Sequence, residues 1–125
     1  MILIPILALV VGGVFALFAT KQIPGDLSEY IGIAALAGTD TVLGGIRAGL
    51  EGRYKNDLFV TGFISNVVLA VGMVYLGDKI GVPQLYLAPV ITFGGRMFVN
   101  LSIIRRLYLT RLQDSTQRKK MEASE

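Results

Sequence analysis

Residues 31–50, with the sequence IGIAALAGTDTVLGGIRAGL, decide how many times this chain crosses a membrane. The segment has the roughly 20 residues that a helix needs to span a bilayer, but it carries Asp40 and Arg47. A charged side chain at the centre of a membrane helix costs about 2.5–3.5 kcal/mol on insertion scales. Four spans result if this segment crosses, and three remain if it stays outside.

Three further apolar stretches flank this segment, at residues 1–19, 58–76 and 84–104. The 125-residue chain is 53% hydrophobic and 17% charged, with a mean hydropathy of +0.61. A soluble domain of this size must cover itself with more polar surface. We therefore predict an all-α membrane protein in which residues 1–106 form four transmembrane helices as two helical hairpins, with three spans as the alternative.

The first stretch has a competing interpretation as a cleaved signal peptide. No basic region precedes it, and Leu17 is too large for the position three residues before a cut after Ala19. We predict an uncleaved span, followed by a turn at Pro24-Gly25.

Lysine and arginine placement predicts the orientation. Lys21 and Lys79 stand alone in the first and third loops, whereas the linker at residues 51–57 contains Arg53 and Lys55. Six of the twelve basic residues follow the last span: Arg105, Arg106, Arg111, Arg118, Lys119 and Lys120. Because Lys and Arg concentrate in cytoplasmic loops, residues 107–125 form a basic cytoplasmic tail in both the three-span and the four-span topology.

Helical periodicity places the intramembrane polar residues on two stripes. The second span carries Ile33, Ala37, Asp40, Gly44, Arg47 and Glu51 on one stripe, and the fourth carries Pro89, Thr92, Arg96 and Asn100. Asp40 and Arg96 lie at similar depth and are predicted to pair, because each is otherwise an uncompensated charge in a low-dielectric medium. Arg47 and Glu51 are i, i+4 neighbours that can pair, and Arg47 can also extend toward headgroups. The candidate site is Asp40, Gly44, Arg47, Arg96 and Asn100.

Other faces are assigned to packing or to lipid. Small residues predict packing stripes in the first span (Ala8, Gly12, Ala16, Ala19) and in the third (Thr61, Ser65, Gly72). Asn66 lies off the latter stripe and should bond a different neighbour. Ile31, Val42 and Ile46 are predicted to face acyl chains, and Pro89 to kink the fourth helix.

Composition also restricts the chemistry. The chain has no Cys, His or Trp, which excludes thiol redox chemistry, Cys/His zinc sites and a histidine base. We expect no catalytic residue, metal or cofactor. The polar stripes either hold the helices in one packing arrangement, which we favour, or line an ion, proton or substrate path around Asp40 and Arg96.

The basic residues of the tail have two interpretations: they either attract anionic headgroups or only retain the orientation of the chain. Residues 105–112 can continue the fourth helix and residues 113–125 should fray; without a folded soluble domain, no nucleic-acid partner is expected.

Several motifs resemble the small basic protein family of bacterial membrane proteins. They are LSEY (27–30), DTVLGGIRA (40–48), FVTGF (59–63) with Asn66, FGGRMFVN (93–100) and IIRR (103–106), and the similarity covers roughly residues 1–108. The resemblance implies a multi-pass protein of the bacterial inner membrane without an established activity. Its members tend to be encoded near cell-division genes, which implies an envelope or division role and supplies no catalytic residue.

These observations favour a non-enzymatic membrane partner or scaffold that contacts the lipid bilayer and either itself or another membrane protein. The alternative is a small transporter or channel subunit that uses the Asp40/Arg96 pair, although the first span lacks the acidic residue of small multidrug transporters. An enzyme acting on lipid or isoprenoid substrates ranks last, because no His, Cys or acidic cluster is present.

Overall fold

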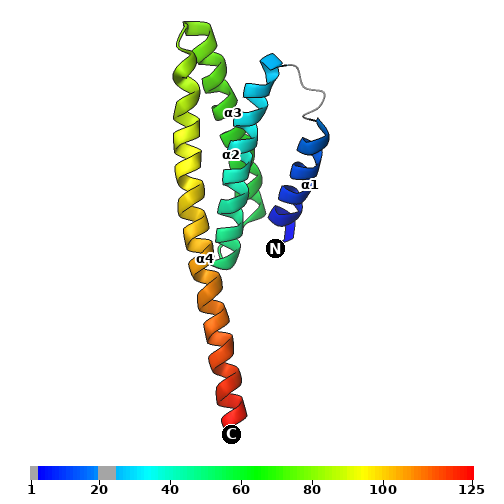
Figure 1. The fold of residues 1–125 in the computed structure, drawn as a ribbon, viewed down its shortest axis with the longest axis vertical. Coiled ribbons are helices and arrows are strands. Elements are labelled where there is room, and N and C mark those ends of the chain that lie inside the picture. Colours follow the sequence, from blue (N-terminus) through cyan, green and yellow to red (C-terminus); the bar gives the residue numbers. More distant parts are fainter. Residues whose placement is uncertain (1–2, 20–24) are drawn as a thin grey trace.

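The computed structural model describes residues 3–19 and 25–125, and within them the chain is helical apart from short turns and the last residue (Figure 1). Its elements are α1 (Leu3–Ala19), α2 (Gly25–Leu50), α3 (Asn56–Ile80), the short 3-10 helix η1 (Pro83–Tyr86) and α4 (Leu87–Ser124). The helices alternate in direction, so that α1 begins at the end of the bundle where α2 gives way to α3 (Figure 1). The all-α prediction is confirmed; the turn expected at Pro24-Gly25 involves residues outside the described part.

Helix α2 is the centre of the bundle, in contact with α1, α3 and α4. Its small side chains allow close approach: Ala37 is fully buried, in one cluster with Ile33 of α2, Ala70 and Val74 of α3 and Phe93 of α4. Ala8 and Gly12 of α1 line a crevice against α2, as expected for the packing stripe of the first span. The side chains of Ala16 and Ala19 lie outside the described part of the chain.

The two turns use glycine where the backbone requires it. Gly52, between α2 and α3, has φ +74°, and Gly81, at the end of α3, has φ +77°, a region that only glycine enters without strain. The amide of Val82 donates to the carbonyl oxygen of Gly77 at 2.9 Å and closes the last turn of α3. Gly77 is buried because the turn between α3 and η1 packs directly against its Cα.

Helix α4 differs from the prediction at both ends. It begins at Leu87, so Pro89 lies in the first turn, where a helix needs no N–H donor, and the predicted kink has no cause. The expected fraying of residues 113–125 is wrong, because α4 continues to Ser124 as one helix that projects past the bundle (Figure 1). Residues 107–125 are therefore a helical extension of the bundle.

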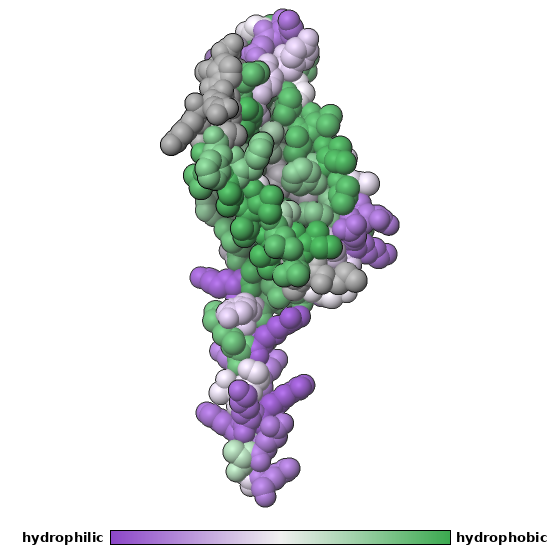
Figure 2. Space-filling model, turned by 90° about the vertical axis from the view of Figure 1, so that its right-hand side faces the viewer, coloured by the Kyte–Doolittle hydropathy of each residue, from purple (hydrophilic) through white to green (hydrophobic). Residues whose placement is uncertain are grey.

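The bundle surface is apolar over most of its length, with polar groups at both ends of the bundle and along the projecting part of α4 (Figure 2). Among the described residues, Asn56–Ile80 and Pro83–Ser124 are long and apolar enough to cross a membrane, and little of either is buried inside the protein. The shorter α1 carries no charge, and α2 does not meet the same criterion of length and composition. The two candidate spanning helices indicate membrane association.

Two side-chain orientations predicted from the sequence are wrong. Val42 is buried instead of facing lipid, because α1 and α3 approach α2 on that side and Val42 lines the crevice between them. Thr61, Ser65 and Gly72 of α3 are exposed, whereas Ala70, Val74 and Gly77 form its buried face. The predicted stripe of small residues in α3 consequently points away from the bundle.

One hydrogen bond joins α2 to α3 at the end opposite the α2–α3 turn. The Tyr30 hydroxyl donates to Asp78 Oδ2 at 2.5 Å, just before the predicted second span. This bond, together with desolvation and the neighbouring charges, raises the pKa of Tyr30 from 10.0 to about 12. A raised tyrosine pKa means that the folded protein favours the neutral hydroxyl, so the stabilisation is complete below pH 10 and is lost as pH rises toward 12.

We therefore expect one of the five tyrosines to titrate last when tyrosinate absorbance is followed from neutral to high pH. Tyr30→Phe should remove this last step, and Asp78→Asn should move it toward pH 10, the ordinary tyrosine value. Tyr75→Phe is the control and should leave the late step in place. A late step that persists in Tyr30→Phe would refute the assignment.

Candidate functional site

Three sets of polar contacts join α2 to its neighbours inside the apolar bundle. We call this region the polar seam and define it by Asp40, Thr41 and Arg47 of α2, Asn66 of α3, and Arg96 and Asn100 of α4. Neighbouring positions on a helix point about 100° apart. Asp40 can thus face α4 while Thr41 faces α3.

The ion pair predicted between Asp40 and Arg96 is present. Arg96 Nη2 lies 3.3 Å from Asp40 Oδ2, with the Asp40 side chain 0% exposed and the Arg96 side chain 53% exposed. Neither Asp40 oxygen accepts a hydrogen bond from the described residues, so Coulomb attraction to the guanidinium is what compensates this carboxylate. The Arg96 guanidinium also lies 5.9 Å from the centroid of the Phe93 ring, within cation–π range.

Thr41 and Asn66 form the contact between α2 and α3. Asn66 Nδ2 donates to Thr41 Oγ1 at 3.0 Å, and the Thr41 hydroxyl donates to the Ala37 carbonyl at 3.1 Å. The sequence predicted a partner for Asn66 but missed Thr41. The position of Thr41 next to Asp40 could have indicated this contact, because it places the Thr41 hydroxyl on a second inward-facing side of α2.

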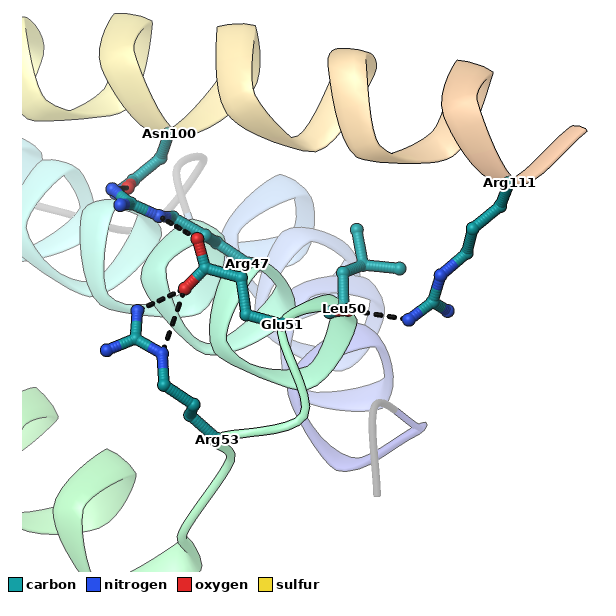
Figure 3. Close-up of polar contacts among 6 residues, drawn as sticks. All are labelled: Arg47, Leu50, Glu51, Arg53, Asn100 and Arg111. Atoms are coloured by element: carbon teal, nitrogen blue, oxygen red, sulfur yellow. Dashed lines mark hydrogen bonds and ion pairs between the residues drawn. The ribbon is translucent and has the colours of Figure 1, made fainter. Parts of the chain in front are cut away.

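Arg47 is the centre of the third contact (Figure 3). Its Nε donates to Glu51 Oε1 at 3.1 Å, and its Nη1 donates to Asn100 Oδ1 at 3.2 Å. The predicted Arg47–Glu51 pair is thus present, and Arg47 binds Asn100 of α4 instead of extending toward headgroups. Gly44 faces Asn100, because a Cβ built at Gly44 would lie 3.8 Å from Asn100 Nδ2, in ordinary van der Waals contact.

Glu51 lies between two arginines at the end of α2 (Figure 3). Arg53 Nε donates to Glu51 Oε2 at 3.1 Å, on the side opposite Arg47. Hydrogen bonds from Arg53 first, and then from Arg47, hold the pKa of Glu51 below its usual value. The α2–α3 turn is therefore tied to the polar seam through one carboxylate.

The tail arginines differ in their environments. All six tail cations named above are exposed along α4, but Arg111 Nη2 donates to the Leu50 carbonyl at 2.6 Å (Figure 3). An arginine that binds a terminal carbonyl caps the end of a helix. Arg111 consequently caps α2 across the bundle, a role that the sequence did not predict.

The arrangement pairs acids with bases and amides with hydroxyls, all between helices. Within residues 3–19 and 25–125, no group of three or more His, Cys, Asp or Glu side chains could hold a metal ion. The five candidate residues Asp40, Gly44, Arg47, Arg96 and Asn100 face one another across α2 and α4, as their stripes predicted. What this geometry does directly is fix how α2 sits between α3 and α4.

The fold and the polar seam define a small all-α protein of apolar helices, two of them long enough to cross a membrane. The chain belongs to the family described as "Protein of unknown function (DUF1290)", whose model matches residues 23–109. It is 44% identical over 117 residues to the "Small basic protein" of Bacillus subtilis (strain 168), covering 94% of this chain and 96% of that protein.

Uncharacterized proteins of Mycobacterium bovis and Mycobacterium tuberculosis are 40% identical to this chain over 105 residues, which cover 83% of this chain and 87% of theirs. No solved structure shows a significant match. The resemblance to the small basic protein family is thus confirmed.

Proposed function

We propose that this chain is a four-span protein of the bacterial inner membrane, with both termini in the cytoplasm. The alternating helix directions and the uncharged α1 support this topology. The cost of inserting α2 is reduced, because Asp40 and Arg47 point into the bundle and are compensated by Arg96, Glu51 and Asn100. The positions of Arg53, Lys55 and the tail cations support the cytoplasmic orientation.

Single cysteines test this topology directly, because the natural chain contains none. Four spans predict that a membrane-impermeant thiol reagent labels Gln22→Cys in intact spheroplasts and labels Ile2→Cys only after lysis. A Gln117→Cys variant in the tail should also require lysis. Labelling of Ile2→Cys and protection of Gln22→Cys in intact cells would favour three spans.

The proposed function is that of a non-enzymatic partner or scaffold in an envelope or cell-division assembly. The observation that carries it is the projecting part of α4, a continuous helix whose side chains are exposed beyond the Arg111–Leu50 contact. A membrane-anchored helix of this kind presents an ordered surface to a protein at the membrane. The paired polar seam is consistent with a rigid anchor.

Site-specific photo-crosslinking in native membranes tests the scaffold. A photoreactive residue at Gln117 should give one protein adduct of defined mass, whereas the same residue at Val68, exposed on the outer face of α3, should give none. Removal of residues 113–125 should abolish co-purification of that partner and leave membrane insertion intact. Absence of adducts at Thr116, Gln117 and Glu122, which lie on three different sides of the helix, would contradict the scaffold.

A small transporter or channel subunit is the second candidate, favoured by the absence of hydrogen bonds to both buried Asp40 oxygens among the described residues. Such a protein should carry protons or small cations across liposomes, and Asp40→Asn should abolish the flux. Wild-type flux no higher than that of empty liposomes would exclude transport of the ions tested and leave the scaffold.

A further inference from the structure

A cavity of about 220 Å³ opens between α2, α3 and α4 beside the α2–α3 turn. Small residues create it: Gly44, Gly45 and Ala48 on α2 and Gly62 on α3. A Cβ built at Gly62 would meet nothing within 4 Å, so the space is unfilled at that position. The cavity adjoins the polar seam, with which it shares Thr41, Asn66 and Arg96 at its inner end.

Three cations from two parts of the chain line this cavity. Arg53 and Lys55 come from the α2–α3 turn, and Arg96 comes from α4. Arg96 has five N–H donors and is half exposed, so its pairing with Asp40 leaves donors for a second acceptor. Lys55 takes part in none of the ion pairs found among the described residues. The two carboxylates paired with cations of this region lie at different levels: Asp40 pairs with Arg96 at the inner end, and Glu51 pairs with Arg47 and Arg53 at the turn.

The beginning of α3 adds to the positive potential. Lys55 is the N-cap residue of α3, and no side-chain hydrogen bond caps the first amides of the helix. Unpaired amides at a helix N-terminus favour an anion, although Asp57 in the first turn opposes part of this effect. Asp57 does not line the cavity.

The other wall of the cavity is apolar. Leu58 and Phe59 line it along α3, in line with the helix axis from the cationic turn. Because α3 is one of the two helices able to span a membrane, its first residues lie at headgroup level when it is inserted. A cationic end at headgroup depth with an apolar wall beneath it matches an amphiphile that has a phosphate at one end and an acyl chain at the other.

We propose that this cavity binds an anionic membrane phospholipid, with its phosphate near Arg53 and Lys55 at the turn and an acyl chain along Leu58 and Phe59 toward the inner end. The proposal needs only that α3 crosses the membrane, and it is independent of the scaffold role. It differs from general attraction of the bilayer to the tail cations, because none of those six residues lines the cavity.

Native mass spectrometry of the purified protein released from detergent tests the proposal. With phosphatidylglycerol added, the wild type should retain one lipid, and with phosphatidylcholine of the same chains it should retain much less. Lys55→Gln should weaken retention about fivefold, as expected for one cation at a lipid surface. Lys119→Gln/Lys120→Gln in the tail should change it less than twofold.

A second pair of variants tests the cavity itself. Gly62→Leu should fill the space and reduce lipid retention more than tenfold, whereas Gly72→Leu on the exposed face of the same helix should leave it unchanged. Circular dichroism of each variant should show an unchanged helix content. Equal losses from the tail variant and Lys55→Gln, or undiminished retention in Gly62→Leu, would overturn the site.

Competition with inorganic phosphate tests whether the site binds a lipid headgroup or a small phosphate compound. A lipid site predicts that millimolar phosphate does not displace phosphatidylglycerol. If phosphate displaces the lipid in the wild type and not in Lys55→Gln, the site takes small phosphate compounds and the assignment to a membrane lipid is overturned. A failed scaffold test would leave all of these measurements unaffected.

Discussion

Arg96→Gln is expected to lower the free energy of unfolding by about 3 kcal/mol, the lower end of the range for breaking a buried ion pair. The reason is the environment of Asp40, which is 0% exposed and has the Arg96 guanidinium 3.3 Å away as its compensating charge. Asp40→Asn should cost less, about 1 kcal/mol, because it removes the buried charge and leaves a half-exposed arginine. The measurement is helix loss in detergent micelles titrated with dodecyl sulfate and followed by circular dichroism.

The double variant makes this prediction specific. Asp40→Asn should recover part of the stability lost in Arg96→Gln, since the charge that lacked a partner is then gone. Arg118→Gln on the projecting part of α4 is a matched control with an exposed arginine, and it should change stability by less than about 0.5 kcal/mol. Simple addition of the two single effects would show that the pair does not couple α2 to α4.

Gly77→Ala is expected to destabilise the protein by about 1–3 kcal/mol, the range found when a packed site is overfilled. The added Cβ would lie 2.6 Å from the Val82 carbonyl oxygen and 3.0 Å from Leu85 Cβ. Val82 belongs to the turn that joins α3 to η1, and Leu85 belongs to η1. The Val82 oxygen cannot move without disturbing the hydrogen bond that it accepts from the Leu85 amide at 3.1 Å. The same titration measures the effect.

Gly72→Ala is the matched control, and its effect should have the opposite sign. A Cβ at Gly72 would meet nothing within 4 Å, so the change removes a flexible residue from the same helix at no packing cost. Alanine should therefore stabilise α3 by up to about 1 kcal/mol at this position. Equal changes of the same sign at the two glycines would mean that the α3–η1 turn does not close on Gly77.

The facing stripes of charged residues could be predicted from the sequence. Of the two predicted stripes of small residues, the one in α1 faces its neighbour and the one in α3 does not. Asp40 and Arg96 could be paired from spacing alone, because a buried charge needs a partner and each helix supplied one at similar depth. A small residue has no charge that needs a partner, so the sequence does not show whether it faces another helix or the lipid. Ala8 and Gly12 do face α2, but Thr61, Ser65 and Gly72 face outward.

Val42, Pro89 and Arg111 could not be assigned for related reasons. Whether Val42 meets lipid or protein depends on where α1 and α3 pack, and an apolar side chain is stable against either. Pro89 was misjudged because η1 delays the start of α4 by one turn. Arg111 reaches Leu50 only because α4 continues as a helix beside the end of α2.

The helical class and the Asp40–Arg96 pair follow from the sequence, since apolar length and uncompensated charge act locally and strongly, and the motifs identify the family. The tertiary structure alone decided that α2 is the central helix, that Thr41 receives Asn66, and that small residues leave a cationic cavity beside the α2–α3 turn. These features arise from the positions of three helices relative to one another. In lipid, apolar side chains favour no particular neighbour, so packing and hydrogen bonds choose the arrangement.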